Sequence, residues 1–314
     1  MNRIRHDTEN DLEIIRIENG NASSFVTIVP SFGANVGQIQ LTKNGRGYPL
    51  LDGNRRRKDF FDRRMFNGAH LVPYPNRVKG GKYRLNGKEY RLPINYENEN
   101  NAAHGFIHNR SFQLIAKKEE AGFAEIILHY SYNGDLSGYP FPFEITYTYA
   151  LDEAAGFICS MTVTNSGQNT MPFGAGLHPY FSFGKEVDRL RLKMPPVWRV
   201  LTDSSMIPTG EEEPDERFTR FAPLGGEKLD TLFRFRNEAE THEVHLNDEA
   251  SGFTVTLWME GKAYPYCQIY IPPDRRSVAV EPMTCAVDAF NNGKGLVFIQ
   301  PGESFKASFG VNLA

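Results

Sequence analysis

The sequence Phe143-Glu144-Ile145-Thr146-Tyr147-Thr148-Tyr149 places large apolar side chains at every second position. Successive side chains of a β-strand point to opposite faces, so this period sends the four apolar residues to one face of a sheet. Comparable runs recur at residues 126–132, 158–164, 253–259, 269–272, 277–280 and 295–300, and a last one lies at 304–311. The pattern predicts an all-β protein.

Turn signals separate these runs. Asn86-Gly87 lies between two alternating runs in residues 82–90 and is the strongest short-range signal for a hairpin. The strand signals are spread evenly, with neither βαβ spacing nor a repeat of 20 to 50 residues. We therefore predict one large antiparallel β-sandwich in a single domain over residues 1–314, with charged insertions at 55–64 and 210–217.

Composition excludes several classes of protein. The 35 Lys and Arg against 38 Asp and Glu give a net charge of −3, which argues against a general nucleic-acid binder. No apolar run approaches the ~18 residues of a membrane span, and residues 1–11 lack the apolar core of a signal peptide. The distant Cys159, Cys267 and Cys285 predict reduced thiols. We expect a cytoplasmic protein with no membrane or nucleic-acid partner.

His178 occupies an unusual position. Period two in residues 173–181 places the apolar side chains on one face and Gly174, Gly176 and His178 on the other. A ligand could approach closely over the two positions that carry no side chain. A structural, hydrogen-bonded histidine is the alternative interpretation.

Glu281 has a similar setting. Val278 and Val280 share the apolar face of the run 277–282, and Glu281 points the other way. Both His178 and Glu281 precede a proline, which holds each in extended backbone. An imidazole and a carboxylate on a rigid scaffold are the groups most used for general acid and base catalysis. For Glu281 the alternative is a solvated charge at a strand end.

Other histidines and a basic cluster carry weaker signals. His104 and His108 have the spacing of a metal-binding pair on a helix, but Gly105 favours a loop, so we predict no metal site. We expect His242 and His245 on the surface. The six basic residues of 55–64 are interpreted as a solvated loop, with a patch for an anionic ligand as the alternative.

Several segments in this order resemble the aldose 1-epimerase (galactose mutarotase) superfamily. They are Asn76-Arg77-Val78, the Asn86-Gly87 hairpin, His104-Gly105, Leu177-His178-Pro179-Tyr180-Phe181, Leu229-Asp230-Thr231-Leu232-Phe233, Glu281-Pro282-Met283-Thr284-Cys285 and Gln300-Pro301-Gly302-Glu303. The resemblance implies a large antiparallel β-sandwich that interconverts the α and β anomers of an aldose without a cofactor. It implies Glu281 as the base and His178 as the acid.

The same resemblance assigns the sugar contacts. They fall on Asn76, Arg77, His104 and Asp230. From the surplus of aromatic residues, Tyr74 and Tyr180 are the candidates for a sugar-facing cleft. The sequence departs from the galactose-specific members at Gly105-Phe106, where they have two glycines, and its Glu281 motif is closer to a bacterial branch of uncharacterised aldose epimerases. The segment His104-Gly105-Phe106, followed soon after by the basic residue Arg110, resembles the hexose-6-phosphate epimerase branch. The resemblance therefore predicts the type of reaction but does not identify the sugar.

The expected partner is a small-molecule sugar, bound by a monomer or a homodimer. We predict that nearby carboxylates raise the protonated fraction of His178, which then acts as the acid, while Glu281 is the ionised base. Three alternatives remain open. They are a hexose-6-phosphate 1-epimerase, a catalytically silent carbohydrate-binding protein, and a glycosidase that uses Asp230 and Glu281 as its two carboxylates.

Overall fold

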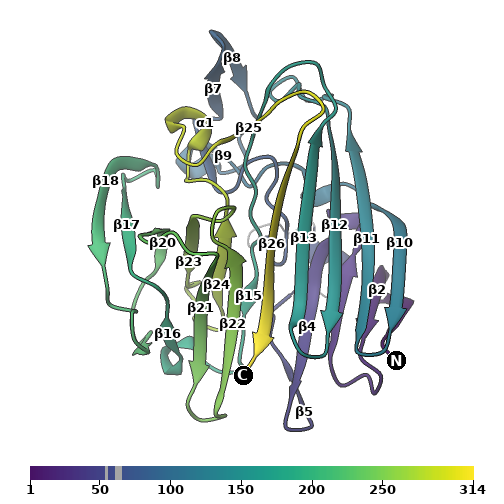
Figure 1. The fold of residues 1–314 in the computed structure, drawn as a ribbon. Helices are drawn as coiled ribbons and strands as arrows, with labels where there is room; N and C mark the ends of the chain where they lie inside the picture. The colour runs from purple at the N-terminus through teal and green to yellow at the C-terminus, as the bar shows by residue number, and fades with distance from the viewer. Residues whose placement is uncertain (54–55, 61–65) are drawn as a thin grey trace.

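The computed structural model describes residues 1–53, 56–60 and 66–314, and it consists mainly of antiparallel strands (Figure 1). The first sheet has the order β1-β2-β3-β4-β5 and is drawn in purple. Its strands are β1 Arg3–Glu9, β2 Leu12–Glu18, β3 Phe25–Val29, β4 Asn35–Lys43 and β5 Arg46–Pro49.

The two larger sheets contain nine and six strands. The nine-stranded sheet has, in spatial order, β10 Gln113–Glu120, β11 Phe123–Tyr132, β12 Phe143–Asp152, β13 Gly156–Asn165, β26 Ser304–Leu313, β22 Phe253–Glu260, β21 Thr241–Asp248, β16 Arg191–Lys193 and β19 Ala222–Pro223. The six-stranded sheet has β15 Tyr180–Phe181, β24 Val278–Met283, β23 Tyr266–Tyr270, β20 Asp230–Phe235, β17 Val197–Thr202 and β18 Pro208–Asp215.

Short elements connect the sheets. Three two-stranded ladders pair β14 Met171–Phe173 with β25 Val297–Ile299, β6 Arg77–Lys79 with β9 Asn101–Ala103, and β7 Lys82–Leu85 with β8 Lys88–Arg91. The helical pieces are α1 Ala289–Asn292 and the 3-10 turns η1 Pro30–Phe32, η2 Arg57–Phe60, η3 Glu97–Glu99, η4 Ile107–Asn109 and η5 Val187–Arg189. No helix in the described ranges is long and apolar enough to cross a membrane.

The nine-stranded sheet forms one layer of a large sandwich. In Figure 1 its strands β10 to β13 lie in front of the first sheet, and β21 and β22 lie in front of β23 and β24. One buried apolar cluster draws side chains from all three sheets, including Ile17, Tyr147 and Val278. The alternating side chains of 143–149 are buried in this cluster, as their period predicts. The prediction of an antiparallel β-sandwich is confirmed.

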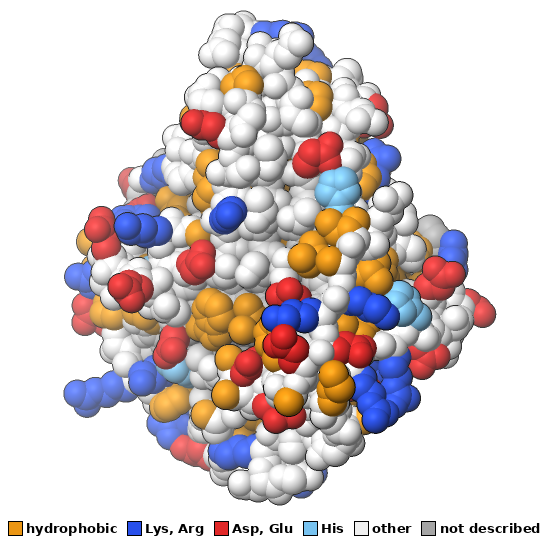
Figure 2. All heavy atoms as spheres, turned by 45° about the vertical axis from the view of Figure 1, so that its right-hand side comes forward, with side chains coloured by type: hydrophobic (Ala, Val, Ile, Leu, Met, Phe, Trp, Pro, Cys, Tyr) orange, Lys and Arg blue, Asp and Glu red, His pale blue; other side chains and the backbone are white. Residues whose placement is uncertain are grey.

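The surface carries both signs of charge. Figure 2 shows acidic and basic side chains intermixed over one face, in keeping with the small net charge. Most of the predicted charged insertion at 210–217 is regular sheet, because residues 208–215 form β18, which pairs with β17 at one edge of the six-stranded sheet. Its acidic side chains are balanced across the sheet, where Arg234 binds Glu212 and Arg199 binds Glu213.

Other predictions of loops and single residues have mixed outcomes. Asn86 and Gly87 both have positive φ and join β7 to β8, so the hairpin is confirmed. Part of the basic segment 55–64 lies outside the described residues; within the described part, Arg56 binds Asp59. All three cysteines are free and buried. His242 is not on the surface, because its ring is buried and stacks on Phe235 at 3.9 Å.

Candidate active site

Three neighbouring strands of the six-stranded sheet present a row of polar side chains. Glu281 on β24 lies opposite Gln268 on β23, and Gln268 donates a hydrogen bond from Nε2 to Oδ1 of Asp230 on β20 at 2.6 Å. Val278 and Val280, which alternate with this face of β24, are buried in the core. The period of the strand therefore turns the Glu281 carboxylate away from the main core, as predicted.

Strand register also brings His178 to Glu281. Tyr180 on β15 pairs with Ala279 on β24, so the antiparallel register places His178 at the level of Glu281. The imidazole Nε2 lies 3.4 Å from Oε1 of Glu281. The Tyr180 ring stacks on the imidazole with centroids 4.7 Å apart, and the backbone N–H of His178 donates to the carbonyl of Ala69. Tyr180 therefore covers one face of the imidazole, and the backbone hydrogen bond fixes the residue that carries it.

A second group of residues reaches the pair from the β6–β9 ladder. Arg77 lies opposite Ala103, and the N–H of His104 donates to the carbonyl of Asn76 at 2.9 Å. Gly105 has a φ of +62°, and a Cβ at this position would lie 2.0 Å from a backbone oxygen, so the chain needs glycine here. The His104 ring meets the His178 ring edge-on at 5.4 Å.

Arg77 joins the two groups. Its guanidinium donates to Oδ1 of Asn76 at 3.0 Å and to Oε2 of Glu99 at 2.8 Å, and it lies 5.3 Å from the centre of the Tyr96 ring. The charge of Arg77 also acts on Asp230 and Glu281. The structure therefore brings together all seven predicted site residues, which are Asn76, Arg77, His104, His178, Tyr180, Asp230 and Glu281.

Burial shifts both members of the central pair toward their neutral forms. It raises the pKa of Glu281 well above its ordinary value, with a further contribution from Asp230 that Arg77 opposes. It lowers the pKa of His178 to about 3. The expectation that nearby carboxylates raise the pKa of His178 is wrong for the ligand-free protein, because burial outweighs them.

Four buried polar atoms in this site have no hydrogen-bond partner among the described residues. They are Oε2 of Glu281, Nδ1 of His178, Nδ1 of His104 and Oε1 of Gln268. Buried polar atoms are normally satisfied, and an unsatisfied group costs about 1–3 kcal/mol. The cluster can therefore donate to and accept from a ligand that is rich in hydroxyl groups.

Two interpretations of the sequence near the site are wrong. A Cβ on Gly174 would lie 2.4 Å from Sγ of Cys285, and one on Gly176 would lie 3.0 Å from a backbone oxygen. These glycines therefore allow close packing of the chain and do not clear space for a ligand. Tyr74 belongs to the main core, where its ring packs edge-on against Phe290 at 5.5 Å.

Sequence reasoning missed Gln268, Tyr96 and Glu99. Gln268 is recognisable only once β23 is paired with β24, and Glu99 only once the chain has turned back on Arg77.

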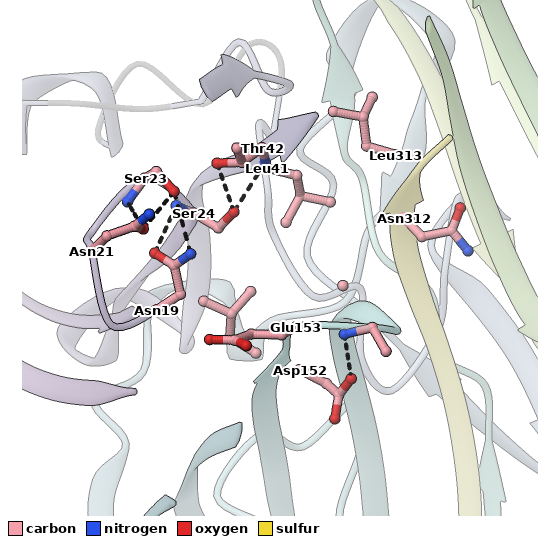
Figure 3. Close-up of a pocket in the computed structure, with 13 residues that line it drawn as sticks. Asn19, Asn21, Ser23, Ser24, Leu41, Thr42, Asp152, Glu153, Asn312 and Leu313 are labelled. Carbon is pink, nitrogen blue, oxygen red and sulfur yellow. Dashed lines mark hydrogen bonds between the residues drawn. The ribbon is translucent and has the colours of Figure 1, made fainter. Parts of the chain in front are cut away.

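In the described ranges, no group of three or more His, Cys, Asp or Glu side chains could hold a metal ion. A separate pocket of about 290 Å³ lies near the turn of residues 19–24 (Figure 3). There Asn19 and Asn21 bond to Ser23 and Ser24 and so stabilise the turn.

Comparison with known proteins identifies the family. A family model described as aldose 1-epimerase matches residues 13–312. The chain belongs to the aldose 1-epimerase family. This family membership makes it an isomerase, as predicted.

Two curated relatives show the range of similarity to this aldose 1-epimerase family chain. Over 250 residues it is 29% identical to the uncharacterized protein YihR of Escherichia coli, covering 78% of each chain. It is 25% identical to galactose mutarotase of Sus scrofa over 227 residues, which is 69% of this chain and 60% of the pig protein.

Solved structures share the fold of this family member. A galactose mutarotase-like protein of Clostridium acetobutylicum superimposes with a TM-score of 0.88 at 22% identity, covering 100% of this chain and 98% of the other. Galactose 1-epimerase from Lactobacillus acidophilus gives a TM-score of 0.81 at 15% identity, with the same coverage. At these identities the likeness establishes the fold.

Proposed function

We propose that this aldose 1-epimerase family member interconverts the α and β anomers of an unphosphorylated aldose, with His178 and Glu281 as its acid and base. The observation that carries the proposal is the buried His178–Glu281 pair, in which Nε2 lies 3.4 Å from Oε1. Anomerisation acts on two oxygens, O1 and the ring oxygen O5, that are bonded to the same carbon. A donor and an acceptor this close together suit that geometry.

The reaction needs one proton to leave and one to arrive. Glu281 takes the proton of the O1 hydroxyl while His178 gives a proton to O5, and the C1–O5 bond breaks to leave an aldehyde. The C1–C2 bond then rotates. On ring closure His178 takes the proton of the O5 hydroxyl, Glu281 returns a proton to O1, and the C1–O5 bond forms on the other face.

The pair therefore holds one proton in both directions. With the cyclic sugar the proton is on His178 and the carboxylate is ionised, and with the open sugar the proton is on Glu281 and the imidazole is neutral. Burial favours the second state in the ligand-free protein. The charge of Arg77 favours the ionised carboxylate that ring opening requires. We infer that sugar binding shifts the balance by supplying hydroxyl groups to the buried atoms.

The rate enhancement expected from one acid and one base is large enough for an enzyme. A positioned general acid or base typically contributes about 10²- to 10⁴-fold, so the pair could lower the barrier by roughly 5–11 kcal/mol. Arg77, Asn76, His104, Asp230 and Gln268 would bind the remaining hydroxyl groups. The side chains of Asp230 and Gln268 already bond to each other, which holds both in place for the sugar.

Charge favours a neutral sugar over a phosphorylated one. The charges of Asp230 and Glu99 both act on the guanidinium of Arg77, whereas burial favours the neutral forms of Glu281 and His178. Arg110 is the residue that supports the hexose-6-phosphate alternative. Its Nη2 lies 3.8 Å from Oδ2 of Asp135, so a carboxylate already pairs with its charge. A phosphate would enter a site that already has more acidic than basic groups.

Polarimetry on freshly dissolved α-glucose and α-galactose tests the proposal. We expect the purified protein to accelerate the approach to anomeric equilibrium for at least one of them. Binding of these sugars without acceleration would refute the proposal and establish the silent carbohydrate-binding alternative. Release of a reducing sugar from a glycoside would instead establish a glycosidase.

A further inference from the structure

Glu99 forms an ion pair with the sugar-binding arginine of the proposed function, on which this inference rests. Its Oε2 accepts from Nε of Arg77 at 2.8 Å, and the side chains of Glu99 and Arg77 are 30% and 8% exposed. Because the pair is largely withdrawn from water, solvent and salt screen it less than a surface pair. Removal of the Glu99 charge should therefore alter the field inside the site.

The turn that carries Glu99 is fixed to the strand that leads into the site. The Asn95 amide donates to the carbonyl of Ala103 and accepts from its N–H, at 3.0 and 2.7 Å. The backbones of Tyr96 and Asn101 exchange two hydrogen bonds of 3.1 Å. Ala103 is the last residue of β9 and directly precedes His104. Glu99 is thus held at the site by the scaffold.

The contacts of Arg77 show what Glu99 does to its charge. Nε binds Glu99, Nη1 binds Asn76, and the face of Tyr96 lies next to the guanidinium. The planar fork of arginine has five donors, so this arrangement leaves N–H groups for hydroxyl oxygens. Glu99 neutralises the positive charge that would otherwise attract an anion to these donors.

We propose that Glu99 is a specificity-determining residue that holds Arg77 for the hydroxyl groups of a neutral aldose and rejects aldoses that carry a phosphate. A sugar phosphate has a charge of about −1.5 to −2 at pH 7. The charge of Arg77 reaches Glu281, and Glu99 is bound to Arg77, so a phosphate on a pyranose bound at the His178–Glu281 pair enters the field of both groups. Glu99 therefore repels the phosphate, and it also binds Arg77, which would otherwise pair with the phosphate.

The test compares Glu99→Gln with two matched variants. Glu97→Gln makes the same change in charge on the same turn, at an exposed side chain, and Glu99→Asp keeps the charge. For each protein, polarimetry measures KM for whichever of α-glucose and α-galactose the wild type anomerises, and Ki of the 6-phosphate of the same sugar is measured as a competitor of that reaction. The ratio Ki/KM reports the discrimination against phosphate.

We expect Glu99→Gln to lower this ratio about tenfold, which corresponds to about 1.4 kcal/mol, through a lower Ki and a KM that is unchanged or raised. Glu97→Gln should change the ratio by less than twofold, and Glu99→Asp should retain most of the discrimination.

A merely structural role for Glu99 would weaken both ligands in parallel, and this result would overturn the inference. So would an equal effect of Glu97→Gln. If the wild-type protein accelerates neither glucose nor galactose, the proposed function itself fails. Acceleration of either sugar by the wild type, with an unchanged ratio in Glu99→Gln, overturns only the role of Glu99.

Discussion

Replacement of Glu281 by glutamine removes the proposed base but keeps the size and shape of the side chain. A positioned general base contributes about 10²- to 10⁴-fold, so the rate of anomerisation should fall by that factor, or by roughly 3–5.5 kcal/mol in the barrier. Glu281 is buried, its Oε1 lies 3.4 Å from Nε2 of His178, and in the proposed mechanism it acts by direct contact with the sugar. We therefore expect the loss mainly in kcat.

The same substitution should leave the fold at least as stable. Burial raises the pKa of Glu281 above its ordinary value of 4.5, so the folded protein binds this proton more tightly than the unfolded chain does. Above pH 4.5 the unfolded chain gains free energy by ionising, and the folded state loses stability as pH rises. Glutamine does not ionise. At pH 7 we therefore expect Tm of Glu281→Gln to be equal to or higher than that of the wild type.

Two measurements check this prediction together. Polarimetry gives the rate, and calorimetry at pH 7 gives Tm for the wild type, Glu281→Gln, His178→Asn and the double variant. Since the two residues share one proton, the double variant should be about as slow as either single variant. A rate within tenfold of wild type for either single variant would refute the assignment. A lost rate with a strongly lowered Tm for Glu281→Gln would refute the electrostatic reasoning.

Three further predictions follow from particular contacts. Burial lowers the pKa of His70 to about 3, so stability should fall as pH drops from 6.5 toward 3, and His70→Gln should flatten Tm against pH in this window. Gly105→Ala should cost about 2–5 kcal/mol in a urea titration, whereas Gly87→Ala, also at positive φ but with open space around it, should cost only about 1 kcal/mol. Gln268→Ala should raise KM for the sugar about tenfold with a smaller change in kcat; an unchanged KM would remove Gln268 from the binding site.

The sequence alone predicts which face of a strand a side chain lies on, because the alternation within that strand decides it. Alternation in 143–149 and 277–282 is enough to assign Tyr147 to the core and Glu281 to the other face, because a strand has only two faces. The pairing of β15 with β24 was not predictable from either segment alone. That pairing is nevertheless what places His178 beside Glu281.

Predictions that needed a contact distant in sequence were the ones that failed. Gly174 is small because Cys285 packs against it, and the sequence contains no sign of that partner. Residues 208–215 are rich in acidic side chains, yet they form a strand in which Glu213 binds Arg199 of the adjacent β17 and Glu212 binds Arg234 of β20. The pKa of His178 depends on the whole surrounding core. The carboxylates that lie near it are a poor guide to this pKa, because burial has the larger effect.

The register of two strands links the fold to the proposed chemistry. Tyr180 opposite Ala279 fixes His178 at the level of Glu281, so the separation of acid and base is set by backbone hydrogen bonds. A proton shared by such a pair returns to its starting point after the ring has opened and closed. The proposed cycle therefore needs no net proton from solvent, and either anomer can begin it. An insertion that shifts β15 by one residue would turn His178 to the opposite face, and activity should then be lost even though both side chains remain.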